Sequence, residues 1–224
     1  ANRNLTYQAP LVIQESVITG SSAQTNVTVF LTAANLPQSF LATNTYAQTD
    51  GGDFRLYSAS GGVTPIPAHI IAWNQTADGS GASCLVALKH ASVSNSADTT
   101  FYAQRTTGTG HSQPAAGAAA GRNAVWAAPY LFVHFGADLV DSTGNGNTMV
   151  LGNANTTLGA TGPWTGSPAI NVGSGSANLG YMTFGSAAAL DNVRTYSRGG
   201  WVRLKEQNYP KFTHLHGKNE IGGG

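Results

Sequence analysis

Short stretches rich in β-branched and aromatic residues recur along the first half of the chain, and turn-forming residues separate them. Segment 54–57 alternates in the period of two that is typical of a strand with one buried face. Pro67 indicates either the start of a strand or an edge position. The same reasoning predicts strands at 26–32, 66–73, 83–89 and 99–105. Strands this short and closely spaced predict an antiparallel β-sandwich over residues 1–107.

Residues 108–124 contain almost no large apolar side chains, and Gly and Ala dominate them. Pro114 and the glycines around it disfavour a helix. The segment is therefore predicted to be a linker between two domains.

The stretch 125–147 begins with Val125 and Trp126, continues through the apolar segment 130–135, and ends in a cluster of Asp, Ser, Thr, Gly and Asn. This order predicts a strand followed by a turn. Further strands are predicted at 148–151, 179–184 and 196–204. The fold class predicted for the whole chain is all-β, with two antiparallel sandwich or jelly-roll domains, the second over residues 125–224.

Charged residues are rare in this chain. They make up 9% of the 224 residues, and the formal net charge is +1. This balance argues against nucleic-acid binding, which needs a basic surface, while 41% hydrophobic residues can still form a core. A neutral composition rich in Ser, Thr, Asn and Gly is typical of surface, secreted and virion proteins. No stretch is long and apolar enough to predict membrane insertion.

The single cysteine, Cys84, excludes an intramolecular disulfide. It lies in an apolar run, so we expect a buried, inert thiol.

Several of these segments resemble known families. Asp50-Gly-Gly-Asp-Phe-Arg55, the stretch 65–73 and the strand at 99–102 resemble the DUF2341 family, a β-sandwich module of surface proteins in bacteria, archaea and phages. Ala124-Val125-Trp126, His134 and the turn 141–147 resemble the start of a concanavalin A-like (LamG-type) jelly roll, which often follows that module. Fewer residues follow Val125 than such a domain usually needs, so we expect it to be truncated or completed by a partner.

The turn 141–147 offers oxygen ligands on a flexible backbone, the chemistry that Ca²⁺ requires. LamG-type domains often bind calcium, and the resemblance implies it here at Asp138, Asp141, Asn145 and Asn147. The alternative is a hydrogen-bonded turn without an ion. No other cofactor is predicted.

Three further groups are candidate sites. Asp50, Asp53 and Arg55 suggest either a ligand site or a turn with a local ion pair. His214 and His216 form a candidate metal pair, with Glu220 as an extra ligand, or else are solvated histidines of the tail. The aromatic residues predicted to contact carbohydrate are Trp164, which is flanked by turn residues, and Tyr181.

The sequence lacks the motifs of hydrolases, nucleotide-binding enzymes and metalloproteases, and its acidic residues are scattered, so no enzymatic activity is predicted. The predicted function is a structural or attachment component of an extracellular assembly, most specifically a phage virion fibre or decoration protein at the virion surface. We expect it to contact other subunits and to form a homo-oligomer. The alternative is a secreted or cell-surface carbohydrate-binding module of a bacterial adhesin.

Overall fold

The computed structural model describes residues 6–128, 130, 133–135, 138–152, 156–162, 168–172 and 182–183. The chain divides into two compact units, residues 1–193 and 194–224, and all described residues belong to the first. They form antiparallel strands with one short α-helix, which confirms the all-β prediction. Among these residues no helix has the length and apolar character to span a bilayer.

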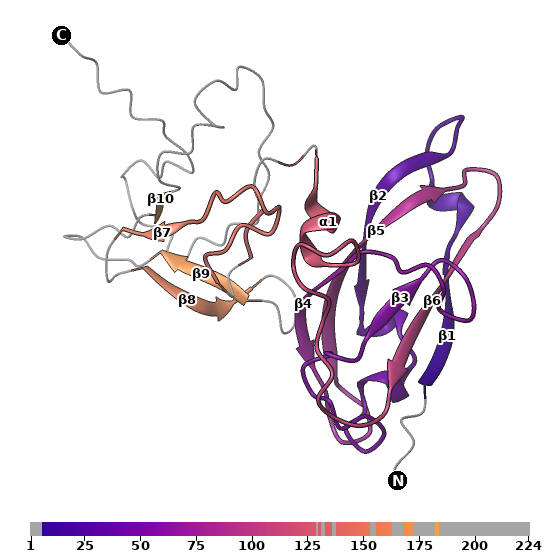
Figure 1. The fold of residues 1–224 in the computed structure, drawn as a ribbon, viewed down its shortest axis with the longest axis horizontal. Helices are drawn as coiled ribbons and strands as arrows, with labels where there is room; N and C mark the ends of the chain where they lie inside the picture. Colours follow the sequence, from indigo (N-terminus) through magenta and orange to yellow (C-terminus); the bar gives the residue numbers. More distant parts are fainter. Residues whose placement is uncertain are drawn as a thin grey trace, which may run out of the picture. The chain divides into compact units, whose positions relative to one another are not determined.

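Two three-stranded sheets form the N-terminal part of the fold (Figure 1). Sheet A has the order β1 (Thr6–Ile13), β6 (Thr99–Thr106), β3 (Arg55–Tyr57). Sheet B has the order β2 (Gln24–Thr32), β5 (Ser83–Val93), β4 (Ala68–Asn74). All neighbouring strands are antiparallel. The five strands predicted for this region are therefore confirmed, and β1 is added to them.

The main hydrophobic core lies between the two sheets. Alternate residues of each strand face it, which is why Leu31, Leu56 and Phe101 are buried while their neighbours in the chain are more exposed. Cys84 belongs to this core, as expected, and burial raises the pKa of its thiol to about 12. Two sheets enclosing one core give the described part of the chain the character of a β-sandwich.

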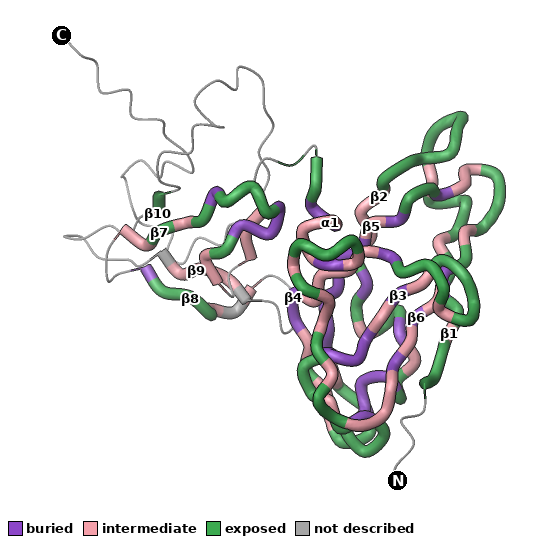
Figure 2. Tube along the Cα trace, in the orientation of Figure 1, coloured by how far each residue is buried: buried purple, intermediate pink, exposed green. Residues whose placement is uncertain are grey.

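Strand β5 is buried on both faces, as Figure 2 shows by its colour. Val86 and Leu88 face the main core, whereas Leu85 and Ala87 face a second cluster on the outer side of sheet B. Helix α1 (Arg122–Trp126) covers that side with Val125 and Trp126, and Val133 and Phe135 pack against the same cluster. A strand covered on both faces reads as a continuous apolar run, which is the pattern of 84–88.

Three 3-10 helices connect the strands of the sandwich. They are η1 (Glu15–Val17), η2 (Ala33–Asn35) and η3 (Gln38–Leu41). Beyond α1, the described strands form two small antiparallel ladders. One pairs β7 (Val150–Leu151) with β10 (Met182–Thr183), and the other pairs β8 (Thr156–Thr161) with β9 (Pro168–Val172).

The structure differs from the sequence interpretation in the middle of the chain. The residues of 130–135 that are described, 130 and 133–135, are not in a strand. Val133 and Phe135 instead cover the outer face of sheet B. The predicted linker is attached to the sandwich, because Ala120 accepts a backbone hydrogen bond from Ala68 and the segment ends in α1. The domain boundaries at 107 and 124 and the jelly roll stay predictions.

Candidate functional site

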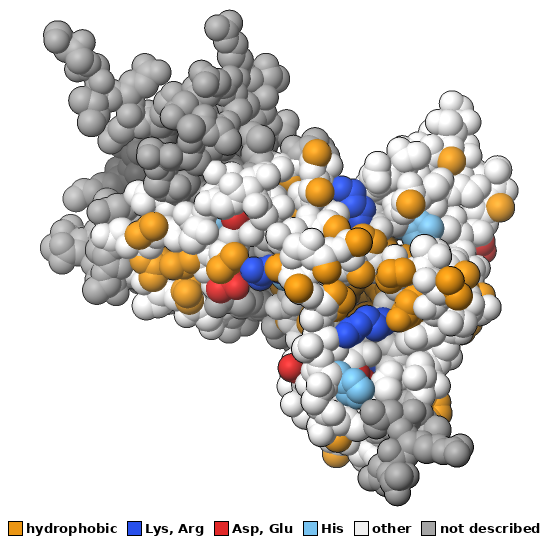
Figure 3. Space-filling model, viewed as in Figure 1, with side chains coloured by type: hydrophobic (Ala, Val, Ile, Leu, Met, Phe, Trp, Pro, Cys, Tyr) orange, Lys and Arg blue, Asp and Glu red, His pale blue; other side chains and the backbone are white. Residues whose placement is uncertain are grey.

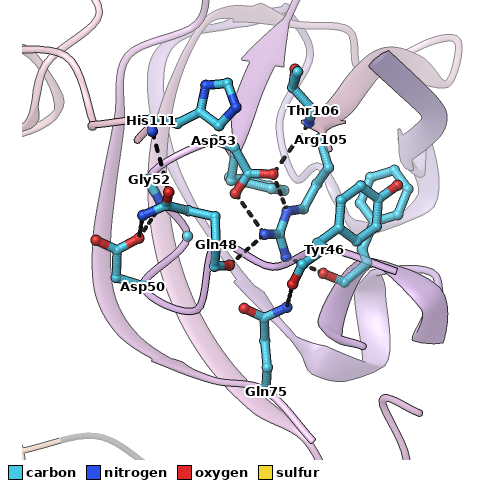
Figure 4. A network of polar contacts seen from close by, with 12 residues as sticks. Tyr46, Gln48, Asp50, Gly52, Asp53, Gln75, Arg105, Thr106 and His111 are labelled. Carbon is cyan, nitrogen blue, oxygen red and sulfur yellow. Dashed lines mark hydrogen bonds and ion pairs between the residues drawn. The ribbon is translucent and has the colours of Figure 1, made fainter. Parts of the chain in front are cut away.

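The most extensive polar network of the sandwich is centred on a buried ion pair between Asp53 and Arg105 (Figure 4). Arg105 lies on β6 and faces inward, and both side chains are 0% exposed. The pair is bidentate: Arg105 Nε donates to Asp53 Oδ2 at 2.8 Å, and Arg105 Nη2 donates to Asp53 Oδ1 at 2.5 Å. This geometry compensates two charges that would otherwise be costly to remove from water.

The remaining donors of Arg105 also have partners inside the protein. Nη1 donates to the Phe40 carbonyl and Nη2 to the Gln48 carbonyl, the latter at 2.9 Å. When the Gln75 amide is turned so that its oxygen faces the guanidinium, it accepts from Nη1 at 3.1 Å. All five N–H groups are then used.

Two aromatic rings flank the guanidinium. Its central carbon lies 4.4 Å from the ring centre of Tyr46 and 5.2 Å from that of Trp73. Burial raises the pKa of Tyr46 to about 12, against the opposing effect of Arg105.

The turn 48–53 holds Asp53 in place. Asp50 accepts hydrogen bonds from Gly52 N at 2.8 Å and Gln48 Nε2 at 2.5 Å. The Gln48 hydrogen bond is the main reason that the pKa of Asp50 is lowered. Gly51 has φ +72°, and a Cβ there would lie 2.7 Å from Cδ1 of Ile70 and 2.9 Å from the rigid ring of Trp73, so this position favours glycine.

The three charged residues singled out in this turn thus have separate roles. Arg55 is not paired with Asp53; its guanidinium donates to the carbonyls of Gly52, at 2.8 Å, and Ser112, at 2.5 Å. The predicted local ion pair between Asp53 and Arg55 is therefore wrong, and Asp53 pairs instead with the distant Arg105. The network connects η3, the turn, β6 and residues 111–113, which is a structural role.

A second polar group lies on the outer side of sheet B. The indole Nε1 of Trp126 donates to Nδ1 of His69 at 3.0 Å, and Phe135 packs edge-on against the same imidazole. Burial lowers the pKa of His69 to about 4, and Arg122 contributes in the same direction. The imidazole is therefore neutral near pH 7, with its ring proton on Nε2.

Beside His69 there is an open cavity of about 260 Å³. It is lined by Ala68, His69, Ile70, Gln113, Pro114, Ala116 and Arg122. Apolar walls with an imidazole, an amide and a guanidinium are a chemistry that suits a small polar ligand. Asp138 lies 3.8 Å from Arg122 Nη1 and partly neutralises its charge.

Asp141 lies at the centre of the turn for which calcium was predicted, and Asp141 is 3% exposed. Each carboxylate oxygen accepts two hydrogen bonds. Oδ1 accepts from the backbone N–H groups of Val133, at 3.1 Å, and Thr143, at 3.0 Å. Oδ2 accepts from Thr143 Oγ1 at 2.7 Å and Asn147 N at 3.2 Å. Burial alone would raise the pKa of Asp141, but these hydrogen bonds outweigh it and lower the pKa.

Three of the four predicted calcium ligands make hydrogen bonds within the protein. Both oxygens of Asp141 already face donors, Asp138 Oδ1 accepts from Val140 N at 3.0 Å, and the Asn145 amide donates to the Tyr130 carbonyl at 3.3 Å. A calcium ion needs six to eight oxygens directed at one point. These contacts are those of a hydrogen-bonded turn, the alternative interpretation, and calcium binding stays a prediction.

Most of the remaining candidate residues lie in parts of the chain that the structure does not describe. Trp164, Tyr181, His214, His216 and Glu220 lie outside the described residues. His134 is half-buried beside the Asp141 turn, and burial lowers its pKa. Within the described ranges, no three His, Cys, Asp or Glu side chains are grouped as a metal site requires.

Sequence reasoning missed Arg105, His69 and Arg122. A signal existed for Arg105, because the alternation of β6 puts it on the same face as Phe101 and Ala103. An arginine in the buried register of a strand needs an acidic partner. No comparable local pattern identifies His69 or Arg122, because the helix that brings them together was taken for linker.

Comparison with protein-family models, curated proteins and solved structures finds no match for this chain. The resemblance to DUF2341 and to LamG-type domains therefore stays a prediction.

Proposed function

We propose that this chain is a structural or attachment component of an extracellular assembly, in its most specific form a fibre or decoration protein on the surface of a phage virion. The observation that carries the proposal is that the charged residues inside the sandwich bond to other parts of the scaffold. Asp53 and Arg105 neutralise each other and bind four segments together, and Arg55 holds the 111–113 segment. These charges hold the scaffold together.

The composition of the chain supports the same proposal. With 9% charged residues, the exposed surface consists mainly of neutral polar and small apolar side chains. Figure 3 shows few charged groups among the coloured atoms of the face in view. Neutral surfaces associate with little electrostatic repulsion and little desolvation of charge, which favours packing among many identical subunits.

The proposal is tested by the mass of the intact protein and the size of the particle that carries it, both measured on material from the native source. We expect the protein in a large particle, in contact with other subunits. A free monomer in the native source would overturn the proposal.

One observation favours a second function, a carbohydrate-binding module of a bacterial adhesin. The open cavity beside His69 combines apolar walls with three polar side chains, which can bind the hydroxyl groups of a sugar. Nuclear magnetic resonance titration with monosaccharides tests it. Shifts that Arg122→Gln abolishes would support this function, and unchanged spectra would refute binding of these sugars at the cavity.

A further inference from the structure

The two sheets of the sandwich have four edge strands, and three of them carry features that prevent pairing with another chain. In β1, Pro10 lies opposite Tyr102 and has no N–H to offer on the open side. The short β3 is already paired on its open side, because Ile66 N donates to the Leu56 carbonyl and Ser58 N donates to the Thr64 carbonyl.

Strand β4 is protected in a different way. Pro67 precedes it, the register shifts between Ile70 and Ala72, and Ala68 N bonds to the Ala120 carbonyl. Prolines, irregular registers and covering segments are the usual devices that keep sheet edges from associating.

Strand β2 has none of these covering features over residues 27–31. Its nine residues contain neither proline nor a charged side chain. Asn26, at φ 54°, makes the start of the strand irregular, and Asn35 occupies Thr32 N at the end. Within the described part of the chain, the backbone of 27–31 makes no hydrogen bond outside its ladder with β5.

We propose that the β2 edge pairs antiparallel with the β2 edge of a second copy of this chain, joining two B sheets into one six-stranded sheet. The inference rests on the proposed role in an assembly and names the surface that mediates it. Antiparallel pairing about a twofold axis brings each strand against itself, so a strand without charge meets no repulsion.

The side chains of β2 suit this partner. Val27 and Val29 are β-branched, and Phe30 on the outer face is 49% exposed, with its ring centre 6.1 Å from that of Trp126. A second copy would cover Phe30 and extend the apolar cluster around Trp126. Since strand pairing alone buries a small area, we expect weak association that depends on protein concentration.

Hydrogen–deuterium exchange of the full chain at rising protein concentration tests the proposal without a mutation. Backbone amides of 27–31 should become more protected as sedimentation velocity shows dimers forming, over about a hundredfold range of concentration. Peptides from β1 should not change. A chain that stays monomeric, or dimers without added protection at 27–31, would overturn the proposal.

A pair of charge variants provides the second test. Phe30→Lys and Phe30→Glu should each weaken the dimer severalfold, because pairing centred on Val29 brings the two like charges close together as diagonal neighbours on one face of the joined sheet. An equal mixture of the two variants should recover association. Recovery on mixing also shows that the variants are folded. Val12→Lys and Val12→Glu are the matched control, since Val12 is 52% exposed on the β1 edge. If the Val12 variants weaken association equally, or if mixing the Phe30 variants has no effect, the β2 edge is not the interface.

These outcomes separate the two proposals. Association, or incorporation into a native particle, without protection at 27–31 refutes the β2 interface and leaves the assembly role standing. A monomer in both solution and native source refutes both.

Discussion

Asp53 and Asp141 both follow or begin a glycine-containing turn, and both carboxylates are buried, yet the protein stabilises them differently. Asp53 is held by a cation, with a bidentate bond to Arg105 from a strand 52 residues later in the chain. Asp141 is held by four neutral donors that all come from residues 133–147. The first carboxylate joins distant segments of the sandwich, and the second closes one local loop.

The difference shows what a buried acid in a turn can do. A carboxylate paired with a buried arginine makes the fold depend on both partners, because either charge alone is uncompensated. A carboxylate bound by N–H and O–H groups leaves no buried charge behind when it is lost. The two sites should therefore respond differently to the same substitution.

The largest effect is expected at the ion pair. Asp53→Asn should lower the free energy of unfolding by about 3–5 kcal/mol, because it leaves the Arg105 charge buried without a counter-ion. Chemical denaturation measures this loss. The double variant Asp53→Leu with Arg105→Met should recover part of the stability, and a double variant no better than the single one would contradict the assignment.

Asp141→Asn is expected to cost less, about 1–2 kcal/mol, because no cation is left unpaired. The amide oxygen still accepts hydrogen bonds, but the amide NH2 group takes the place of one acceptor and leaves a backbone N–H group without its partner. Asp141→Ala should cost about 2–3 kcal/mol, since the donors around it lose their acceptor. The same denaturation experiment compares the two. If Asp53→Asn and Asp141→Asn lowered the free energy of unfolding equally, the proposed difference between the two sites would be contradicted.

The glycines beside the two aspartates sharpen the comparison. Gly51→Ala should cost about 2 kcal/mol, because φ is positive there and the new Cβ would lie 2.9 Å from the rigid ring of Trp73. Gly144→Ala should cost about 1 kcal/mol: its φ is +82°, but the nearest atom is the amide nitrogen of Asn123, a side chain that can move. Thermal unfolding ranks the two variants, and the reverse order would show that the packing around Gly51 is not the deciding factor.

Acid should affect the Asp141 turn in a defined window. The folded pKa of Asp141 lies below its usual value of roughly 3.9. The stability it contributes is therefore fully present above that value and is lost as pH falls through the lower folded pKa. Unfolding free energies measured from pH 6 down to about 2 should fall less steeply in Asp141→Asn than in wild type. Parallel curves would contradict the assignment.

Much of the sandwich could be predicted because its strands are locally encoded. The alternation at 54–57 and the apolar run at 83–89 place β3 and β5 within a few residues of where they lie. The partner of Asp53 could not be found locally, since Arg55 is two residues away and Arg105 is fifty-two. The spacing of residues along the chain does not show which strand packs against the turn that contains Asp53.

The segment after the sandwich was harder to interpret for a physical reason. An apolar run such as 130–135 predicts burial, but it does not say whether the residues pair as a strand or cover a sheet that already exists. Here Val133 and Phe135 do the second. The helix α1 is only five residues long and follows an Ala/Gly-rich stretch, so its formation depends on packing of Val125 and Trp126 against β5.

The most direct test of the account is thermal unfolding of the full chain with excess calcium and with chelator, for wild type and Asp141→Asn. If hydrogen bonds from the protein occupy both oxygens of Asp141, the thermal unfolding midpoint of wild type should be the same with calcium and with chelator. Asp141→Asn should then lower this midpoint by the same amount under both conditions. A wild-type midpoint that rises with calcium, with the rise absent from Asp141→Asn, would show that the turn is a metal site and would contradict the account.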